Sequence, residues 1–255
     1  PLLPAGAYGP FGAVRPRELW ILVLFFSGLS FLAWMARRLL GPGHGVVVAG
    51  LLGGVISSTS VTLSFARASR PGKASRRALA LGTIGACTVM LLRVLLASAI
   101  LNLAVARALV PYVWVSLVIG ATVLGAGWWN SRDGAREQPE SSHSPLQLTA
   151  ALQMTAMFQL VLIVVSAVMA WWSVRALLLT SALIGLTDLD ALTLSLSRTP
   201  GATAAQAAQA LAVGVLSNTL LKLGVAAVVG QSAYRMWVGG ALGAMAAAVA
   251  AAIWL

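Results

Sequence analysis

Two stretches of the chain, GGVISSTSVTLSFAR at residues 53–67 and IGLTDLDALTLSLSR at residues 184–198, decide the expected fold. Each is an apolar run that contains a glycine, is interrupted by short polar side chains and ends in arginine. An offset of 131 residues pairs Gly54 with Gly185, Ser57 with Asp188, Thr59 with Asp190, Thr62 with Thr193, Ser64 with Ser195 and Arg67 with Arg198. An offset of 129 residues then pairs Gly85 with Gly214, Thr88 with Ser217 and Arg93 with Lys222. These matches at two nearly equal offsets predict an internal repeat.

The sequence around these stretches is strongly apolar. Of its 255 residues, 59% are hydrophobic and only 9% are charged, against roughly 25% charged in a soluble domain. Runs of about 20 apolar residues, the length of a membrane-spanning helix, occupy residues 19–36, 46–66, 78–101, 109–129, 148–172, 176–197, 204–229 and 236–255. They do not alternate in polarity as barrel strands do. The sequence therefore predicts an all-α integral membrane protein with eight transmembrane helices in a lipid bilayer.

The one long polar segment divides the chain into two halves. Residues 1–129 are predicted to form an N-terminal repeat of four helices preceded by a short irregular segment, residues 130–147 a polar cytoplasmic linker, and residues 148–255 a second four-helix repeat. Four crossings in each half bring the chain back to the same face. We therefore expect two parallel repeats, with a binding site at the midplane between them.

The basic residues predict the orientation, because cytoplasmic loops are enriched in Lys and Arg. In this eight-crossing frame ten lie on the N-terminal face: Arg15, Arg17, Arg67, Arg70, Lys73, Arg76, Arg77, Arg132, Arg136 and Arg198. Five lie on the other face: Arg37, Arg38, Arg107, Arg175 and Arg235. Both termini are then predicted to be cytoplasmic. The net charge is +11, but the charged residues lie between apolar runs and do not form one basic cluster. A nucleic-acid partner is therefore not expected.

Four ionisable residues lie deep inside predicted helices: Arg93, Asp188, Asp190 and Lys222. Such a residue costs about 2.5–3.5 kcal/mol at the centre of a membrane helix before it finds a partner. One interpretation is buried ion pairs that hold the halves together, for example between Lys222 and either aspartate. The other is an ion or solute path. The two are compatible, because ion pairs can act as gates.

Asp188 and Asp190 would point about 200° apart on a regular helix. Either protein surrounds that helix, or it is unwound around residues 185–190. Residues 57–60, which are Ser, Ser, Thr and Ser, place a similar run of polar side chains in the corresponding helix of the first half, so the same two alternatives apply there. A broken helix would offer carbonyl groups and helix ends to an ion, whereas ordinary bonding of hydroxyls to the preceding turn would explain the Ser and Thr residues alone.

These residues form the candidate ion or solute path: Ser57, Ser58, Thr59, Thr62, Arg93, Asp188, Asp190, Thr193, Asn218 and Lys222. Their oxygen atoms suit a hard cation such as Na⁺ or Mg²⁺, with Asp188 and Asp190 as candidate ligands. Arg93 and Lys222 would be counter-charges or could receive an anion, so the sign of the solute stays open. No motif for a nucleophile, a nucleotide phosphate or zinc is present, and we do not expect an enzyme.

A small-residue pattern begins the last predicted helix. Gly239 and Gly243 are four residues apart in an alanine-rich run, a spacing that lets helices approach closely. It fits packing within the bundle or a homodimer interface through this helix.

The motifs together resemble a known family. GPFGAVRPRELW at residues 9–20, GLLGGVISSTSVTLSFAR at 50–67, Arg93, the Leu101–Asn102 pair, GLTDLDALTLSLSR at 185–198 and LSNTLLK at 216–222 are similar to the membrane domain of unknown function 4010. That domain commonly follows an MgtC/SapB-type domain, so the resemblance implies a bacterial or archaeal plasma-membrane protein with a fused or associated MgtC-type partner. The absence of a starting Met fits the loss of such a domain.

The resulting hypothesis is a transporter-like or channel-like protein that moves or senses a cation or small solute. The alternative is a non-transporting membrane module that binds a protein or lipid partner and whose intramembrane ion pairs are structural.

Overall fold

The structure is a computed structural model that describes residues 45–70, 75–129, 174–198 and 202–255. In these residues every regular element is a helix, and there is no strand. The helices are α2 (Gly45–Ala68), α3 (Arg76–Leu101), α4 (Leu103–Trp129), α6 (Val174–Thr187), α7 (Leu189–Arg198), α8 (Ala204–Val229) and α9 (Ser232–Trp254). The predicted crossings at 19–36 and 148–172 and the predicted linker lie outside the described residues.

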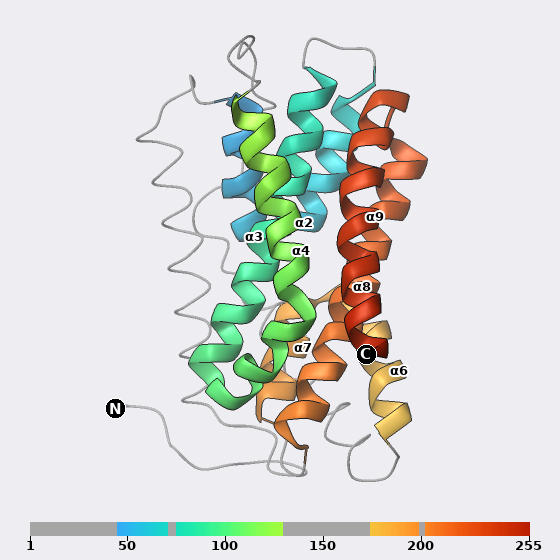
Figure 1. The fold of residues 1–255 in the computed structure, drawn as a ribbon. Coiled ribbons are helices and arrows are strands. Elements are labelled where there is room, and N and C mark those ends of the chain that lie inside the picture. The colour runs from blue at the N-terminus through green and yellow to red at the C-terminus, as the bar shows by residue number, and fades with distance from the viewer. Residues whose placement is uncertain (1–44, 71–74, 130–173, 199–201) are drawn as a thin grey trace, which may run out of the picture. The chain divides into compact units, whose positions relative to one another are not determined.

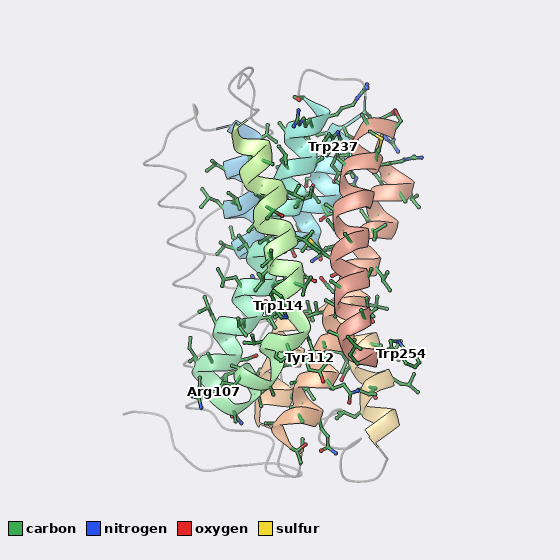
Figure 2. All side chains as sticks on the ribbon, in the orientation of Figure 1. Arg107, Tyr112, Trp114, Trp237 and Trp254 are labelled. Atoms are coloured by element: carbon green, nitrogen blue, oxygen red, sulfur yellow. The ribbon has the colours of Figure 1, made fainter. Side chains whose placement is uncertain are left out.

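By their total length and apolar composition alone, five helices, α2, α3, α4, α8 and α9, could cross a membrane. The all-α membrane class predicted from the sequence is therefore confirmed. Trp237 and Trp254 lie near the two ends of α9 (Figure 2) and are exposed, as expected of aromatic anchors at the two surfaces of a bilayer.

Short polar side chains mark where helices begin. The amide oxygen Oδ1 of Asn102 accepts the N–H groups of Ala104 at 3.1 Å and Val105 at 3.4 Å, which caps the start of α4. Before α8, Thr203 Oγ1 accepts the Gln206 N–H at 3.2 Å, and Gln206 Oε1 accepts the Thr203 N–H at 3.0 Å. This reciprocal capping box satisfies donors that a helix N-terminus leaves unpaired.

The described helices belong to two compact units. Unit 1 holds the end of α3, the start of α4, all of α6 and α7, and α8 as far as Asn218. Unit 2 holds α2, α3 as far as Arg93, the rest of α4 and α8, and α9. Each unit is described by itself below.

In unit 2, α2 does not run straight. Ser57 leaves the helical conformation, with φ −159° and ψ 104°. A Cβ atom built on Gly82 of α3 would lie 2.5 Å from Phe65 Cε2 and 2.9 Å from the Val46 carbonyl oxygen. A straight helix would hold Val46 and Phe65 about 28 Å apart, so both can reach Gly82 only if α2 folds back at Ser57. We call α2 the first hairpin, with arms at residues 45–56 and 58–68 (Figure 1, blue to cyan).

In unit 1, α6 and α7 also reverse direction, and Asp188 alone separates them. A Cβ atom on Gly214 of α8 would lie 3.3 Å from the Ser181 carbonyl oxygen of α6 and 3.4 Å from Leu189 Cδ2 of α7, and would collide with Leu192. In a straight helix Ser181 and Leu192 would be about 16 Å apart along the axis. We call α6 and α7 together the second hairpin.

These hairpins correct the prediction of one straight crossing at residues 46–66 and another at 176–197. Apolar composition does not distinguish one crossing from two half-length arms. The arms of the first hairpin have 12 and 11 residues, or about 18 and 16 Å of helix, so each reaches only the middle of a hydrocarbon core about 30 Å thick.

The predicted orientation of two connections is also wrong. The Ser69 hydroxyl accepts the Gln231 N–H at 3.0 Å, and Arg70 Nε donates to the Val229 carbonyl oxygen at 3.4 Å. The Arg77 guanidinium lies 5.1 Å from the centre of the Trp237 ring. The α2–α3 and α8–α9 connections therefore lie at the same end of unit 2, whereas eight straight crossings had placed them on opposite faces.

Candidate functional site

The tip of the first hairpin is formed by Ser57 and the residues on either side of it. Ser57 Oγ accepts the Ser60 N–H at 3.2 Å and donates to Ser60 Oγ at 3.0 Å. This hydroxyl caps the second arm, in the manner usual for serine at a helix N-terminus. Ser58 is buried and Thr59 is half-buried at the start of that arm.

Arg93 of α3 binds the end of the first arm. Its Nη1 atom donates to the carbonyl oxygens of Val55 at 2.5 Å and Ile56 at 3.4 Å. These carbonyls precede the break, where the helical ladder ends and the helix dipole places partial negative charge. Only 8% of Arg93 is exposed. A buried guanidinium therefore serves as a cation at the tip of the first hairpin.

The tip of the second hairpin has a carboxylate in the capping position. Asp188 Oδ1 accepts the N–H groups of Asp190 at 2.9 Å and Ala191 at 3.1 Å. Asp190 follows in the first turn of α7 and is only 4% exposed. Ser57 and Asp188, which the 131-residue offset pairs, thus have the same local role: each caps the arm that follows the break.

Asn218 of α8 binds the end of α6. Its Nδ2 group donates to the Gly185 carbonyl oxygen at 2.8 Å. The two helices approach closely here, because a Cβ atom on Gly185 would lie 2.5 Å from Gly214 Cα. Asn218 is 4% exposed, and its Oδ1 atom is buried without a hydrogen bond to the described residues.

Thr62 and Thr193 show a simpler pattern. The Thr62 hydroxyl donates to the Ser58 carbonyl oxygen at 2.8 Å, and the Thr193 hydroxyl donates to the Leu189 carbonyl oxygen at 2.7 Å. Both are bonds to the preceding turn, the alternative considered for these hydroxyls.

Lys222 is fully buried, with 0% exposure, and its Nζ atom lies 2.7 Å from Met90 Sδ in unit 2. The sequence predicted Lys222 as a site residue but not its contact with this sulfur, because a methionine in an apolar helix usually has a packing role. Tyr234 was also missed: its hydroxyl lies 2.9 Å from Thr83 Oγ1 and donates to the Thr62 carbonyl oxygen at 3.3 Å. The expected pairing of Lys222 with an aspartate stays a prediction.

The candidate residues divide between the units. Unit 2 contains Ser57, Ser58, Thr59, Thr62, Arg93 and Lys222, and unit 1 contains Asp188, Asp190, Thr193 and Asn218. Within the described ranges, no three or more His, Cys, Asp or Glu residues come together as a metal-binding group. The role of Asp188 and Asp190 as cation ligands stays a prediction.

Comparison with known proteins identifies a family. Residues 24–230, most of the chain, match the model described as "Domain of unknown function (DUF4010)". No curated protein and no solved structure matches the chain. The MgtC/SapB-type partner that the sequence suggested stays a prediction.

Proposed function

We propose that this chain, which belongs to the DUF4010 family, is a membrane transporter of a cation or small solute and uses the helix ends exposed at a helix break to bind it. The observation that carries the proposal is the pair of helix breaks at Ser57 and Asp188. Non-helical backbone at membrane depth is tolerated where it is buried in protein or lines a cavity. Transporters use such half-helix ends to bind ions and charged substrates.

The buried ionisable residues support the same function. Arg93, Asp190 and Lys222 are each at least 90% buried, by their exposures of 8%, 4% and 0%. An ionisable residue inside a membrane protein costs free energy to bury, and such residues mark ion paths or proton relays. Arg93 and Asp190 lie at hairpin tips, where a conformational change would alter their surroundings most directly. Purely structural ion pairs would not require one helix break beside Arg93 and another beside Asp190.

The hairpins also change the proposed topology. A hairpin enters and leaves on one face. If the crossings predicted from the sequence at residues 19–36 and 148–172 are counted with the observed helices, each half of the chain has three: 19–36, α3 and α4 in the first, and 148–172, α8 and α9 in the second. An odd number of crossings inverts the second half relative to the first. We therefore replace the parallel arrangement by inverted repeats.

The positive-inside rule gives the orientation of this topology. The linker face carries ten basic residues: Arg37, Arg38, Arg67, Arg70, Lys73, Arg76, Arg77, Arg132, Arg136 and Arg235. The opposite face carries five: Arg15, Arg17, Arg107, Arg175 and Arg198. The linker face is then cytoplasmic. Both termini lie on the opposite face, in place of the cytoplasmic termini expected from eight straight crossings.

Flux through proteoliposomes tests the function. The purified chain is reconstituted and placed under gradients of Na⁺, H⁺, K⁺ or Mg²⁺, and charge movement is recorded on a solid-supported membrane. We expect a current with at least one gradient, and its loss in Asp190→Asn. Thr122→Val is the control, because the exposed Thr122 hydroxyl only donates to Ile119 at 2.9 Å within α4. Absence of both current and radiolabelled solute uptake under every gradient would contradict the proposal.

A further inference from the structure

We propose that one end of unit 2 binds the phosphate group of an anionic phospholipid from the surrounding bilayer. The phosphate would be bound by four exposed arginines, which we call the arginine cluster: Arg70, Arg76, Arg77 and Arg235. The inference concerns a partner at the membrane surface and does not depend on transport.

The arginine cluster gathers where two helix connections meet. The Ser69 hydroxyl, just after α2, accepts the Gln231 N–H, just before α9, at 3.0 Å. Arg76 Nε donates to the Ser69 carbonyl oxygen at 3.3 Å. Arg70 Nε donates to the carbonyl oxygen of Val229, the last residue of α8, at 3.4 Å. Two guanidinium groups therefore bind the same short region of backbone.

The other two arginines approach from the α9 side of this region. Arg235 Nε donates to the Gly230 carbonyl oxygen at 2.5 Å, and its Nη2 atom lies 3.4 Å from the Val228 carbonyl oxygen. The Arg77 guanidinium lies 5.1 Å from the centre of the Trp237 ring, a distance at which a cation is attracted to an aromatic face. All four side chains are thus held at one end of unit 2.

These contacts leave most of the hydrogen-bonding capacity of the arginine cluster unused. A guanidinium has five N–H donors in a planar fork, and Arg70 and Arg76 each use only Nε in the contacts described. Binding of helix-end carbonyls explains those Nε contacts, but it does not explain Arg77, which contacts a ring. Arginine forks match the oxygen atoms of a phosphate, so the geometry suits a phosphate ligand.

The charge of unit 2 also requires an anion. In residues 45–70, 75–93, 112–129 and 219–255, the described part of this unit, no side chain is acidic. The four positive charges of the arginine cluster are therefore not neutralised by a carboxylate side chain among those residues. An anionic ligand would reduce the repulsion between them.

The apolar side chains beside the arginine cluster favour a lipid over a soluble anion. Met236 and Trp237 follow Arg235 in α9 and are 69% and 41% exposed, and Trp237 lies at the start of that helix (Figure 2). Tryptophan at a helix end is typical of the headgroup level of a bilayer. The proposed orientation places this end at the cytoplasmic leaflet, which carries anionic lipids. Phosphate donors next to an exposed apolar surface match a headgroup with its acyl chains.

The test measures lipid binding to the full chain in a neutral detergent. Dioleoylphosphatidylglycerol or dioleoylphosphatidylcholine is added in mixed micelles, retained lipid is counted by native mass spectrometry, and the unfolding temperature is recorded. We expect saturable binding of phosphatidylglycerol and a rise in unfolding temperature that phosphatidylcholine does not reproduce. Equal retention of the two lipids overturns the inference.

A soluble probe distinguishes a lipid from a free phosphate compound. Glycerophosphoglycerol carries the same phosphodiester without acyl chains, and we expect it to leave the unfolding temperature unchanged at concentrations where phosphatidylglycerol saturates. An equal rise with this probe overturns the lipid as the ligand.

Variants test the arginine cluster itself. Arg77→Gln should weaken phosphatidylglycerol binding about fivefold, and Arg70→Gln combined with Arg235→Gln roughly 30-fold, from the interaction of each basic residue with an anionic surface. Arg77→Gln keeps the backbone contacts described above, so it remains informative if the double variant is unstable. Arg107→Gln, which removes an exposed arginine of unit 1, is the matched control and should bind normally. Unchanged affinity in Arg77→Gln, or an equal loss in Arg107→Gln, overturns the inference.

Salt gives an independent readout that a purely structural role of these arginines would not produce. Exposed charges are screened at about 1 M salt, where the Debye length is about 3 Å, so phosphatidylglycerol binding should weaken there. Binding that is unaffected by salt contradicts an arginine–phosphate contact and overturns the inference.

Discussion

Gly82→Ala tests whether the two arms of the first hairpin meet on α3. The new Cβ would lie 2.5 Å from Phe65 Cε2 on one arm and 2.9 Å from the Val46 carbonyl oxygen on the other. The carbonyl belongs to the backbone and cannot rotate away, so one arm must shift. Overpacking of this kind costs about 1–3 kcal/mol. Alanine has a better helix propensity than glycine, and this offsets about 0.5–1 kcal/mol of the overpacking cost.

The net loss is up to about 2.5 kcal/mol, which corresponds to a fall of up to roughly 10 °C in unfolding temperature for a chain of this size. Relative to a glycine-to-alanine change at an uncrowded helix position, the deficit is about 1–3 kcal/mol. The assay is thermal unfolding of the purified protein in detergent, followed by intrinsic tryptophan fluorescence. Gly125→Ala in α4 is the control, because nothing lies within 4 Å of its added Cβ, and it should be neutral or slightly stabilising. If Gly82→Ala were as stable as Gly125→Ala, the contacts that define the hairpin would be refuted.

Three further predictions follow from single contacts. Asp188→Ala should destabilise the protein by about 1 kcal/mol through loss of the α7 cap, whereas Asp188→Asn keeps the acceptor and most of the stability. Chemical unfolding compares the two variants, and equal losses of stability would argue against the capping role. Tyr234→Phe should cost about 1 kcal/mol because it removes the hydrogen bonds to Thr83 and Thr62, and an unchanged unfolding temperature would contradict this. Alkaline phosphatase fused after Leu255 should be active and a fluorescent protein fused there should be dark in bacteria, and the reverse result would contradict the inverted topology.

The sequence predicted the helical class and the ends of most helices, and it offered a break near residues 185–190 and 57–60 as one of two alternatives. The helix boundaries could be predicted because an apolar run is a local feature of the sequence. For α8 the predicted run at 204–229 coincides with the observed helix. A break near Asp188 could be considered from the sequence because Asp188 and Asp190 cannot share one face of a regular helix. Ser57 occupies the paired position in the first half, which extended the same alternative to that helix.

The reversal at each break was not predicted, and this error changed the topology. Two arms that each reach the midplane have the same composition as one helix that crosses the bilayer. Only contacts between residues far apart in sequence, such as Val46 and Phe65 on Gly82, distinguish them. The observed contacts of Arg93 with two backbone carbonyls and of Lys222 with Met90 were not predicted, for a related reason. Backbone carbonyls at Val55 and Ile56 and the sulfur of Met90 leave no signal in the residue pattern.

The distance between the arms of the first hairpin tests the central claim most directly. Val48 and Arg67 lie on opposite arms and are not buried, so each can be replaced by cysteine and spin-labelled in a Cys87→Ala background. Cys87 is the chain's one cysteine, so the labels mark these two sites alone. A hairpin predicts packed arms with axes about 8–10 Å apart and strong dipolar broadening in the electron paramagnetic resonance spectrum. A separation near the 28 Å or so of a straight helix would contradict the account.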